Sequence, residues 1–332
     1  MIPENTDSDS EKLKKVDPSM INVIVRDRID EAEGVISLLL ERPDGGSLPK
    51  WEPGAHLELV LGESLIRQYS LSSDPQNSSQ WRLGVLREPE GRGGSERVFQ
   101  TLLPGVEVVV SEPRNNFLLE PSSQYLFIAG GIGITPILSM ITVAERKGIP
   151  WRLLYGGRSR NSMAFVKELQ QYGDRVTFAP QDEVGLLDLA SWLEHVEPGM
   201  TVYSCGPEPL LNAVERQMAH WPAGSLRVER FRPKVLESVE EDHEFEVEFI
   251  DSDVTLKIPA DRSILSVAED AGLPLFSSCE EGTCGTCQTR VIEGLIDHRD
   301  SLLSKEEQGR NDIMLICVSR AAKGCSKLRL RG

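Results

Sequence analysis

The sequence predicts a multidomain chain: an antiparallel β domain, an α/β domain with a parallel sheet, and a smaller α+β domain. Three observations lead to this expectation. Short alternating apolar runs broken by Gly and Pro fill residues 21–121, strand and helix patterns alternate over 122–232, and a cysteine-rich loop follows two strand-like runs in 245–332. A length of 332 residues accommodates all three units.

Residues 1–20 are polar, mixed in charge and without the apolar run of a signal peptide, so we expect a disordered tail. In 21–121, runs such as GVISLLLER, GAHLELVL and WRLGVLRE recur at regular spacing. This pattern predicts an antiparallel barrel or sandwich.

In 122–232, the strand-like runs YLFIAG, WRLLYGG, VTFAP and TVYSCGP each precede a helix-like run. The alternation predicts a parallel sheet with helices on both faces. Residues 125–144 carry no charge and are long enough to span a bilayer. Three glycines and Pro136 interrupt them, which favours a buried strand, a turn and a buried helix. The acidic segment 233–244 has little to bury and is predicted to be a linker.

The formal net charge of -16 argues against nucleic acid or an anionic membrane as a partner. With no signal peptide, we expect a cytoplasmic protein in which disulfides are uncommon.

The loop CEEGTCGTC, followed by one distant cysteine, has the C-x4-C-x2-C…C spacing of a plant-type [2Fe-2S] site. Gly282 and Gly285 supply the backbone freedom for a tight loop whose N–H groups can face the sulfurs. A zinc site is the open alternative, although structural zinc usually pairs two short cysteine knuckles. The predicted ligands are Cys279, Cys284, Cys287 and Cys317.

The segment FIAGGIGITPIL is typical of a phosphate-binding turn between a strand and a helix. Gly130, Gly131 and Gly133 would let the backbone approach a pyrophosphate. We expect Thr135 to cap the following helix and Pro136 to take its first position. The later turn Cys205, Gly206 and Pro207 would lie at the same sheet edge, where ligands of open α/β sheets bind. Alternatively, Cys205 is simply a small buried side chain.

Two motifs in the first region suggest a ring and a phosphate site. In RQYSL, Tyr69 offers a flat face, Arg67 a cation for a phosphate and Ser70 a hydroxyl. In GRGGS, Gly93, Gly94 and Ser95 form a turn with exposed amides. As bare motifs they fit equally a core tyrosine and a solvated arginine.

Taken in order, RQYSL, GRGGS, PRNNF, GGIGITPIL, CGP, VERF and the cysteine loop resemble the ferredoxin–NADP reductase superfamily. From about residue 20 onward the chain is similar to its phthalate dioxygenase reductase type, which includes vanillate demethylase reductases. This resemblance implies an FMN-binding β-barrel (21–121), an NAD-binding α/β domain (122–232) and a C-terminal ferredoxin domain of β-grasp fold (245–332).

The resemblance also implies roles for individual residues. Ser70, near flavin N5, and Cys205 would be catalytic, and Phe231 would lie close to the flavin. The flavin ring and ribityl chain would contact Arg67, Gln68, Tyr69 and Ser70, and the FMN phosphate would contact Arg87, Gly93, Gly94 and Ser95. The nicotinamide and its diphosphate would contact Thr135, Pro136, Cys205, Gly206 and Pro207.

The resemblance favours FMN over FAD, because GRGGS is similar to the FMN-type members, and NADH over NADPH. NADPH stays open because Arg158 and Arg160 follow the second strand of the α/β region, where an arginine can receive a 2′-phosphate. A solvated loop arginine is an equally good interpretation of Arg160.

A nicotinamide delivers two electrons as hydride, whereas a [2Fe-2S] cluster accepts one, so a flavin is needed between them. The resemblance implies electron flow from NADH through FMN and the cluster to a Rieske-type oxygenase that hydroxylates or demethylates aromatic or amine substrates. Alternatives are a cytochrome P450 as acceptor, a redox-sensing protein without turnover, and a zinc-stabilised adaptor.

Overall fold

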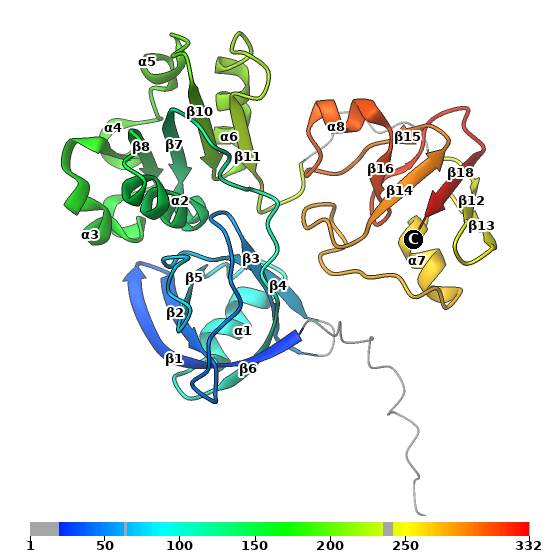
Figure 1. Cartoon of the computed structure of the whole chain (residues 1–332), viewed down its shortest axis with the longest axis horizontal. Coiled ribbons are helices and arrows are strands. Elements are labelled where there is room, and N and C mark those ends of the chain that lie inside the picture. The colour runs from blue at the N-terminus through cyan, green and yellow to red at the C-terminus, as the bar shows by residue number, and fades with distance from the viewer. Residues whose placement is uncertain (1–19, 63–64, 235–241, 332) are drawn as a thin grey trace, which may run out of the picture.

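The computed structural model describes residues 20–62, 65–234 and 242–331, which form three sheet-based units in chain order (Figure 1). The predicted tail lies outside the described residues except for Met20, which begins the first strand. Residues 235–241 of the predicted linker also lie outside them.

The first unit is a six-stranded antiparallel barrel with strand order β4-β3-β6-β1-β2-β5. A bridge between Leu71 and Leu83 closes β4 toward β5. Alternating residues such as Leu57, Leu59 and Val85 point into one fully buried core, which confirms a barrel rather than a sandwich. Its elements are β1 (Met20–Ala32), β2 (Val35–Glu41), β3 (His56–Val60), β4 (Ile66–Ser70), β5 (Trp81–Leu86), α1 (Gly94–Thr101) and β6 (Glu107–Ser111).

The second unit is a parallel sheet of order β11-β10-β7-β8-β9. Alternate residues of the central strand pack on opposite faces: Phe127 lies in the cluster that contains helix α2, and Ile128 in the cluster that contains α6. Strands β8 and β9 lie on one side of β7, and β10 and β11 lie on its other side, so the strand order reverses between β7 and β10. The strands and long helices are β7 (Gln124–Gly130), α2 (Ile134–Arg146), β8 (Trp151–Gly157), β9 (Val176–Pro180), β10 (Met200–Cys205), α6 (Glu208–Gln217) and β11 (Leu226–Glu229).

The uncharged stretch 125–144 therefore forms a buried strand, a turn (Gly131–Gly133) and a helix, as predicted. Within the described residues, no helix has the length and apolar character needed to cross a bilayer.

Two of the helix-like runs in this unit form only short helices. In 164–173, only α3 (Val166–Leu169) is α-helical, and a 3-10 segment follows (Gln170–Arg175) in which Gly173 leaves helical geometry with φ 57°. In 186–195, α5 spans only Leu189–Leu193, because Asp188 caps its start by accepting the Ser191 N–H at 3.3 Å. A one-turn helix, α4 (Gln181–Val184), precedes it.

The third unit is a mixed sheet of order β13-β12-β18-β14-β16 packed on helix α7, the α+β fold expected of a ferredoxin. Phe245, Val247, Phe249, Leu328 and Leu330 form its centre. Its elements are β12 (Phe245–Phe249), β13 (Val254–Ile258), α7 (Ile264–Asp270), β14 (Gln288–Glu293), β15 (Ile296–Asp297), α8 (Lys305–Arg310), β16 (Ile313–Leu315), β17 (Arg320–Ala321) and β18 (Lys327–Arg331).

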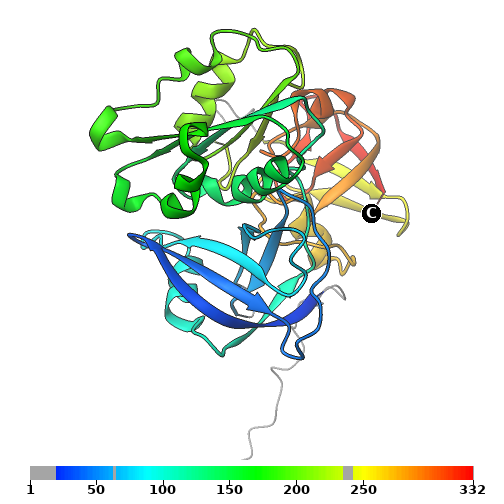
Figure 2. The same cartoon turned by 60° about the vertical axis from the view of Figure 1, so that its left-hand side comes forward.

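The α/β unit stacks on the barrel, and the C-terminal unit lies beside both (Figures 1 and 2). Strand β5 makes part of the first contact. Arg82 forms an ion pair with Glu168 at 2.7 Å and lies over the Phe165 ring. A Cβ on Gly84 would lie 2.5 Å from the Thr135 methyl group, so the absence of a side chain allows the two units to meet.

Candidate functional site

The RQYSL segment forms strand β4, next to the start of helix α1. The Arg67 guanidinium donates to the Arg92 carbonyl at 2.8 Å, and a Cβ on Gly94 would lie 2.4 Å from Arg67 Cγ. Gly93 has φ 77°, and no atom lies within 4 Å of its Cβ position. The first-turn N–H groups of α1, an open corner and an arginine therefore meet at one place, and this set of donors fits a phosphate group.

The remaining residues of β4 divide between two faces of the strand pair. Burial raises the pKa of Tyr69 to about 12, so its phenol stays neutral while it packs on the barrel core. Ser70 is buried opposite His56 of β3. Gln68 lies opposite Glu58 and donates to its carboxylate at 3.3 Å.

Two other predicted phosphate residues already have protein partners. Arg87 forms an ion pair with Glu96 at 2.7 Å, and its guanidinium lies over the Phe99 ring. The Ser95 hydroxyl accepts the Glu88 N–H at 2.9 Å. Arg87 would have to leave Glu96 to reach a phosphate, whereas Arg67 is already at the helix start.

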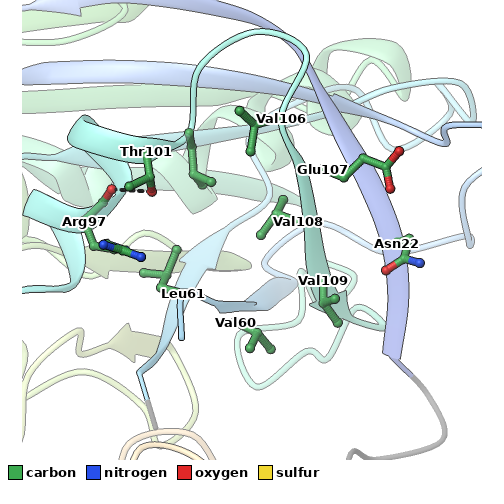
Figure 3. Close-up of a pocket in the computed structure, with 10 residues that line it drawn as sticks. Asn22, Val60, Leu61, Arg97, Thr101, Val106, Glu107, Val108 and Val109 are labelled. Atoms are coloured by element: carbon green, nitrogen blue, oxygen red, sulfur yellow. Dashed lines mark hydrogen bonds between the residues drawn. The ribbon is translucent and has the colours of Figure 1, made fainter. Parts of the chain in front are cut away.

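A pocket of about 310 Å³ opens on a different part of the barrel (Figure 3). At its edge the Thr101 hydroxyl donates to the Arg97 carbonyl at 2.7 Å. None of the predicted flavin residues lines it, so we assign it no cofactor. Its lining residues are Asn22, Val60, Leu61, Arg97, Thr101, Leu102, Val106, Glu107, Val108 and Val109.

The carboxyl ends of β7 and β10 bring two glycine turns into contact at the point where the strand order reverses. A Cβ on Gly133 would lie 2.2 Å from the Cys205 carbonyl oxygen, and one on Gly206 would lie 3.0 Å from Gly130 Cα. Gly130, Gly133 and Gly206 are therefore required because the two turns pack directly against each other, with no room for a side chain. Gly131 differs: its φ is 54° and nothing lies within 4 Å of its Cβ position, so it provides the open side that fits a dinucleotide phosphate.

The expected helix cap is wrong. Helix α2 begins at Ile134 with Gly133 as its N-cap residue, so Thr135 is inside the first turn and Pro136 is its third residue. The Thr135 hydroxyl donates backward to the Ile132 carbonyl at 3.0 Å. The 3-10 turn that precedes the helix shifts the start, and Pro136 is tolerated because first-turn N–H groups have no helical partner.

Sequence reasoning missed Glu229, the last residue of β11. It pairs in register with Cys205, and its carboxylate lies 3.9 Å from the Cys205 sulfur. Burial raises the pKa of Glu229 to about 8, and burial with this neighbour also raises the pKa of Cys205. The motif VERF contained the signal, but only Phe231 had been assigned from it. Phe231 is 43% exposed just beyond the strand.

The two loop arginines after β8 differ in their surroundings. Arg160 pairs with Glu183 at 3.4 Å. Arg158 is exposed, and in the described part of the chain its side chain forms no ion pair. Of the two, Arg158 is therefore the one available to an anionic ligand.

The four predicted cluster ligands lie together at the C-terminal unit and interact as two pairs, Cys279 with Cys284 and Cys287 with Cys317. All are free thiols. Among the described residues, no three or more His, Cys, Asp or Glu side chains are grouped as one metal ion would require. A two-plus-two set of thiols fits two bridged irons better than a tetrahedral zinc.

Backbone N–H groups already face these sulfurs. The Glu281 N–H donates to Cys279 Sγ at 3.3 Å, and the Thr286 N–H donates to Cys284 Sγ at 3.4 Å. Gly282 and Gly285 have φ of 71° and 77°, as predicted for a loop that turns its amides inward. The loop is thus built to stabilise negative charge on sulfur.

The cluster loop also contacts the barrel. Asn116, from the PRNNF motif, donates to the Cys284 carbonyl at 2.8 Å. Arg92, from the GRGGS motif, pairs with Glu281 at 2.7 Å. The candidate phosphate corner and the candidate cluster loop are therefore neighbours.

Comparison with known proteins gives the same organisation. Residues 247–322 match a family model for a 2Fe-2S iron–sulfur cluster binding domain, and residues 127–216 match one for an oxidoreductase NAD-binding domain. The chain is 38% identical to a phthalate 4,5-dioxygenase oxygenase reductase subunit from Pseudomonas putida, over 95% of this chain and 97% of that protein. It is 39% identical to a vanillate O-demethylase oxidoreductase from a Pseudomonas species, over 94% and 100%.

Among solved structures, a phthalate dioxygenase reductase described as modular for electron transfer from pyridine nucleotides to [2Fe-2S] matches with a TM-score of 0.70 at 34% identity, over 94% of this chain and 98% of that one. An intact type IV self-sufficient cytochrome P450 monooxygenase matches with a TM-score of 0.87 at 38% identity, over 94% of this chain but only 41% of that one. The chain belongs to the phthalate dioxygenase reductase type of the ferredoxin–NADP reductase superfamily.

Proposed function

We propose that this protein is the NADH-dependent reductase component of a multicomponent oxygenase and passes single electrons to a Rieske-type oxygenase. The observation that carries the proposal is the hydrogen bond from Asn116 of the barrel to the Cys284 carbonyl of the cluster loop. It brings a candidate cluster ligand against the barrel that holds the candidate flavin strand. With the nucleotide unit stacked on the same barrel (Figure 1), this contact supports a path that runs from the nucleotide edge through the barrel to a one-electron carrier.

We assign the domains as a barrel (21–121), a nucleotide domain (122–232), a linker (233–244) and a ferredoxin domain (245–332). In the barrel, Arg67 and the N–H groups of Gly94 and Ser95 would hold the FMN phosphate, with Gly93 keeping the corner open. Arg87 contributes if it exchanges Glu96 for the phosphate. Tyr69, Gln68 and Ser70 would contact the ring and ribityl chain.

At the nucleotide edge, Gly131 leaves room for the NADH diphosphate, and Thr135, Pro136, Gly206 and Pro207 border it. Cys205 and Glu229 form the floor at the ends of β10 and β11. Burial raises the pKa of Glu229 to about 8, which favours the protonated, uncharged form of this floor at neutral pH. Cys205 is fully buried at this edge, and an uncharged carboxyl beside it would avoid a negative charge next to the dihydronicotinamide.

When bound, NADH, FMN and the [2Fe-2S] cluster supply hydride donation, two-electron storage with single-electron release, and one-electron transfer, respectively. In balance, one NADH and two oxidised one-electron acceptors give NAD⁺, one proton and two reduced acceptors. The chain's own residues bind and orient these groups, and no acid–base triad is required. Free thiols and an iron–sulfur loop suit a reducing compartment, so we place the protein in the cytoplasm.

Replacing Cys284 with Ser tests the order of the path. Reduction of cytochrome c by NADH should be lost, because the cluster loses a ligand, while NADH still bleaches the flavin absorbance. Cys325, which lies outside the ligand set, gives the matched control, and Cys325→Ser should keep both activities. Equal loss of flavin bleaching and cytochrome c reduction in Cys284→Ser would overturn the proposed order.

A cytochrome P450 is the second candidate acceptor. The likeness to a self-sufficient P450, in which a similar region occupies 41% of a longer chain, supports it. Reconstituting the reductase separately with a Rieske-type oxygenase and with a P450 distinguishes the two, since productive pairing couples NADH consumption to substrate oxidation.

A further inference from the structure

Glu58 is a buried carboxylate at the junction of barrel and cluster loop, and the proposed function above gives it no role. Its side chain is only 3% exposed. One oxygen, Oε1, accepts hydrogen bonds from Gln68 at 3.3 Å, Arg114 at 3.3 Å and Thr286 at 3.2 Å. The first two partners belong to the barrel and the third to the cluster loop. A buried carboxylate is costly unless it is well partnered, so these contacts are what retain it.

Thr286 connects Glu58 to a candidate cluster ligand. Its hydroxyl accepts the Arg114 guanidinium at 2.7 Å and stands 3.2 Å from both Glu58 Oε1 and Cys284 Sγ. A sulfur that ligates iron is a thiolate and carries no proton. The single hydroxyl proton of Thr286 therefore has two competing acceptors, a carboxylate oxygen and a thiolate sulfur.

Acceptor strength, rather than distance, favours the carboxylate. The Thr286 hydroxyl lies 3.2 Å from each acceptor, which is long for an O–H···O bond. The carboxylate carries its full charge, whereas a thiolate that ligates iron shares its charge with the metal, so the carboxylate is the stronger acceptor. Arg114 holds Glu58 Oε1 and Thr286 Oγ1 in place, because its Nη1 donates a hydrogen bond to each of them. The backbone N–H of Thr286 remains the donor to Cys284 Sγ.

Hydrogen bonds to cluster sulfurs and local charge are two of the factors that set the reduction potential of an iron–sulfur centre. A carboxylate lowers the cluster potential in two ways. Its negative charge disfavours the reduced, more negative cluster, and by binding the hydroxyl proton it removes a hydrogen bond that would stabilise the charge on the ligand sulfur. The same contacts press the loop against the barrel, beside the Asn116 bond to the Cys284 carbonyl.

We propose that Glu58 is a positioning residue that docks the cluster loop on the flavin barrel through Arg114 and Thr286, and that it keeps the cluster potential low by holding the Thr286 hydroxyl proton. This inference rests on the proposed function, because it assumes a [2Fe-2S] cluster on the four cysteines. It gives the PRNNF motif a purpose: Arg114 and Asn116 both bind the cluster loop.

The test is a redox titration of the purified holoprotein, with the cluster followed by electron paramagnetic resonance. Glu58→Gln, which has nearly the same shape, should raise the midpoint potential, since it removes the charge and frees the Thr286 proton for Cys284 Sγ. Glu281→Gln is the control. It removes a carboxylate from the cluster loop itself, but one that is 29% exposed and paired with Arg92, so its shift should be smaller.

Thr286→Val separates the hydrogen bond from the charge. If Glu58 holds the proton, this variant stays near the wild-type potential, and Glu58→Gln raises the potential less in the Thr286→Val background than in the wild type. A fall in potential in Thr286→Val would show that the hydroxyl donates to sulfur and would overturn the proposal, whether or not Glu58→Gln folds. So would an unchanged potential in Glu58→Gln.

Hydrogen exchange of the cluster loop gives a second readout. Exchange across 279–287 should be faster in Glu58→Gln than in Glu281→Gln, and equal rates would refute the docking role. Wild-type protein without iron would instead refute the proposed function, so the two failures are distinguishable.

Discussion

The contact between strand β5 and helix α2 can be tested by adding one methyl group. A Cβ at position 84 would lie 2.5 Å from Thr135 Cγ2 and 3.3 Å from the Phe165 ring. Replacing a strand glycine normally gains about 0.5–1 kcal/mol, whereas overpacking of a tight site costs about 1–3 kcal/mol. We therefore expect Gly84→Ala to lower the free energy of unfolding by about 1–2 kcal/mol.

The same substitution should slow flavin reduction. Thr135 lies in the first turn of α2, beside the proposed nucleotide edge, so separating it from β5 would move a nucleotide bound there away from the barrel. Misplacement of reacting groups by about 1 Å can cost on the order of a hundredfold in rate, and we expect at least a tenfold loss in stopped-flow flavin reduction by NADH. Denaturant unfolding measures the stability.

The chain offers both a rescue and a control for this prediction. Thr135→Ser removes the clashing methyl group but keeps the hydroxyl that bonds Ile132, so Gly84→Ala with Thr135→Ser should recover most of the stability and rate. Gly309→Ala adds the same methyl group to helix α8 where nothing lies within 4 Å, and should stabilise by about 0.5–1 kcal/mol. Strict additivity of Gly84→Ala and Thr135→Ser would refute the steric reasoning.

Three further predictions concern the buried side chains of His56 and Glu229 and the exposed side chain of Arg158. Burial lowers the pKa of His56 from 6.5 to about 4, so on acidification the unfolded chain binds a proton before the folded chain does. The free energy of unfolding should therefore fall by about 3 kcal/mol as the pH drops from 6.5 to about 4. In denaturant unfolding measured against pH, His56→Gln should abolish that slope. Burial raises the pKa of Glu229 from 4.5 to about 8, so the folded protein retains a proton that the unfolded chain loses, and stability should decrease as pH rises across that interval but not in Glu229→Gln. Arg158→Ala should lower kcat/KM for NADPH about tenfold, the value of a charge-assisted hydrogen bond, and should leave kcat/KM for NADH nearly unchanged. The control Arg160→Ala should change neither value. Equal effects of Arg158→Ala on both nucleotides would contradict a 2′-phosphate contact.

Features that depend on local spacing were predictable from the sequence. The cysteine spacing indicated an iron–sulfur loop, and the positive φ of Gly282 and Gly285 confirms why glycines separate the ligands. The parallel sheet was readable because each buried strand is a short apolar run followed by a glycine turn. The strand pattern alone left barrel and sandwich open, and the resemblance implied the barrel. The closure of β4 toward β5 confirms it, and no local pattern encodes that closure.

Features that depend on contacts between distant segments were not predictable. Gly133 is required because the Cys205 carbonyl lies against it, and these residues are brought together only by the reversal of strand order. Glu229 reaches Cys205, and with it the proposed nucleotide edge, only through the register of β10 and β11. The start of α2 was misplaced because a 3-10 turn, rather than Thr135, precedes the helix.

The two interfaces of the barrel differ in chemistry. Toward the nucleotide domain, barrel-side residues Val35 and Phe117 join the same buried apolar cluster as Phe127, so separating these units exposes hydrophobic surface. The apolar cluster of the ferredoxin domain contains only residues from 245 to 330, and the described residues of this domain contact the barrel through hydrogen bonds and ion pairs, including Arg92–Glu281. Exposed ion pairs contribute about 0–1 kcal/mol each, whereas buried apolar area contributes about 25 cal/mol per Å². The nucleotide domain and the barrel thus share one apolar core, whereas the ferredoxin domain is held to the barrel by polar contacts, of which the buried Glu58–Thr286 contact is the costliest to break.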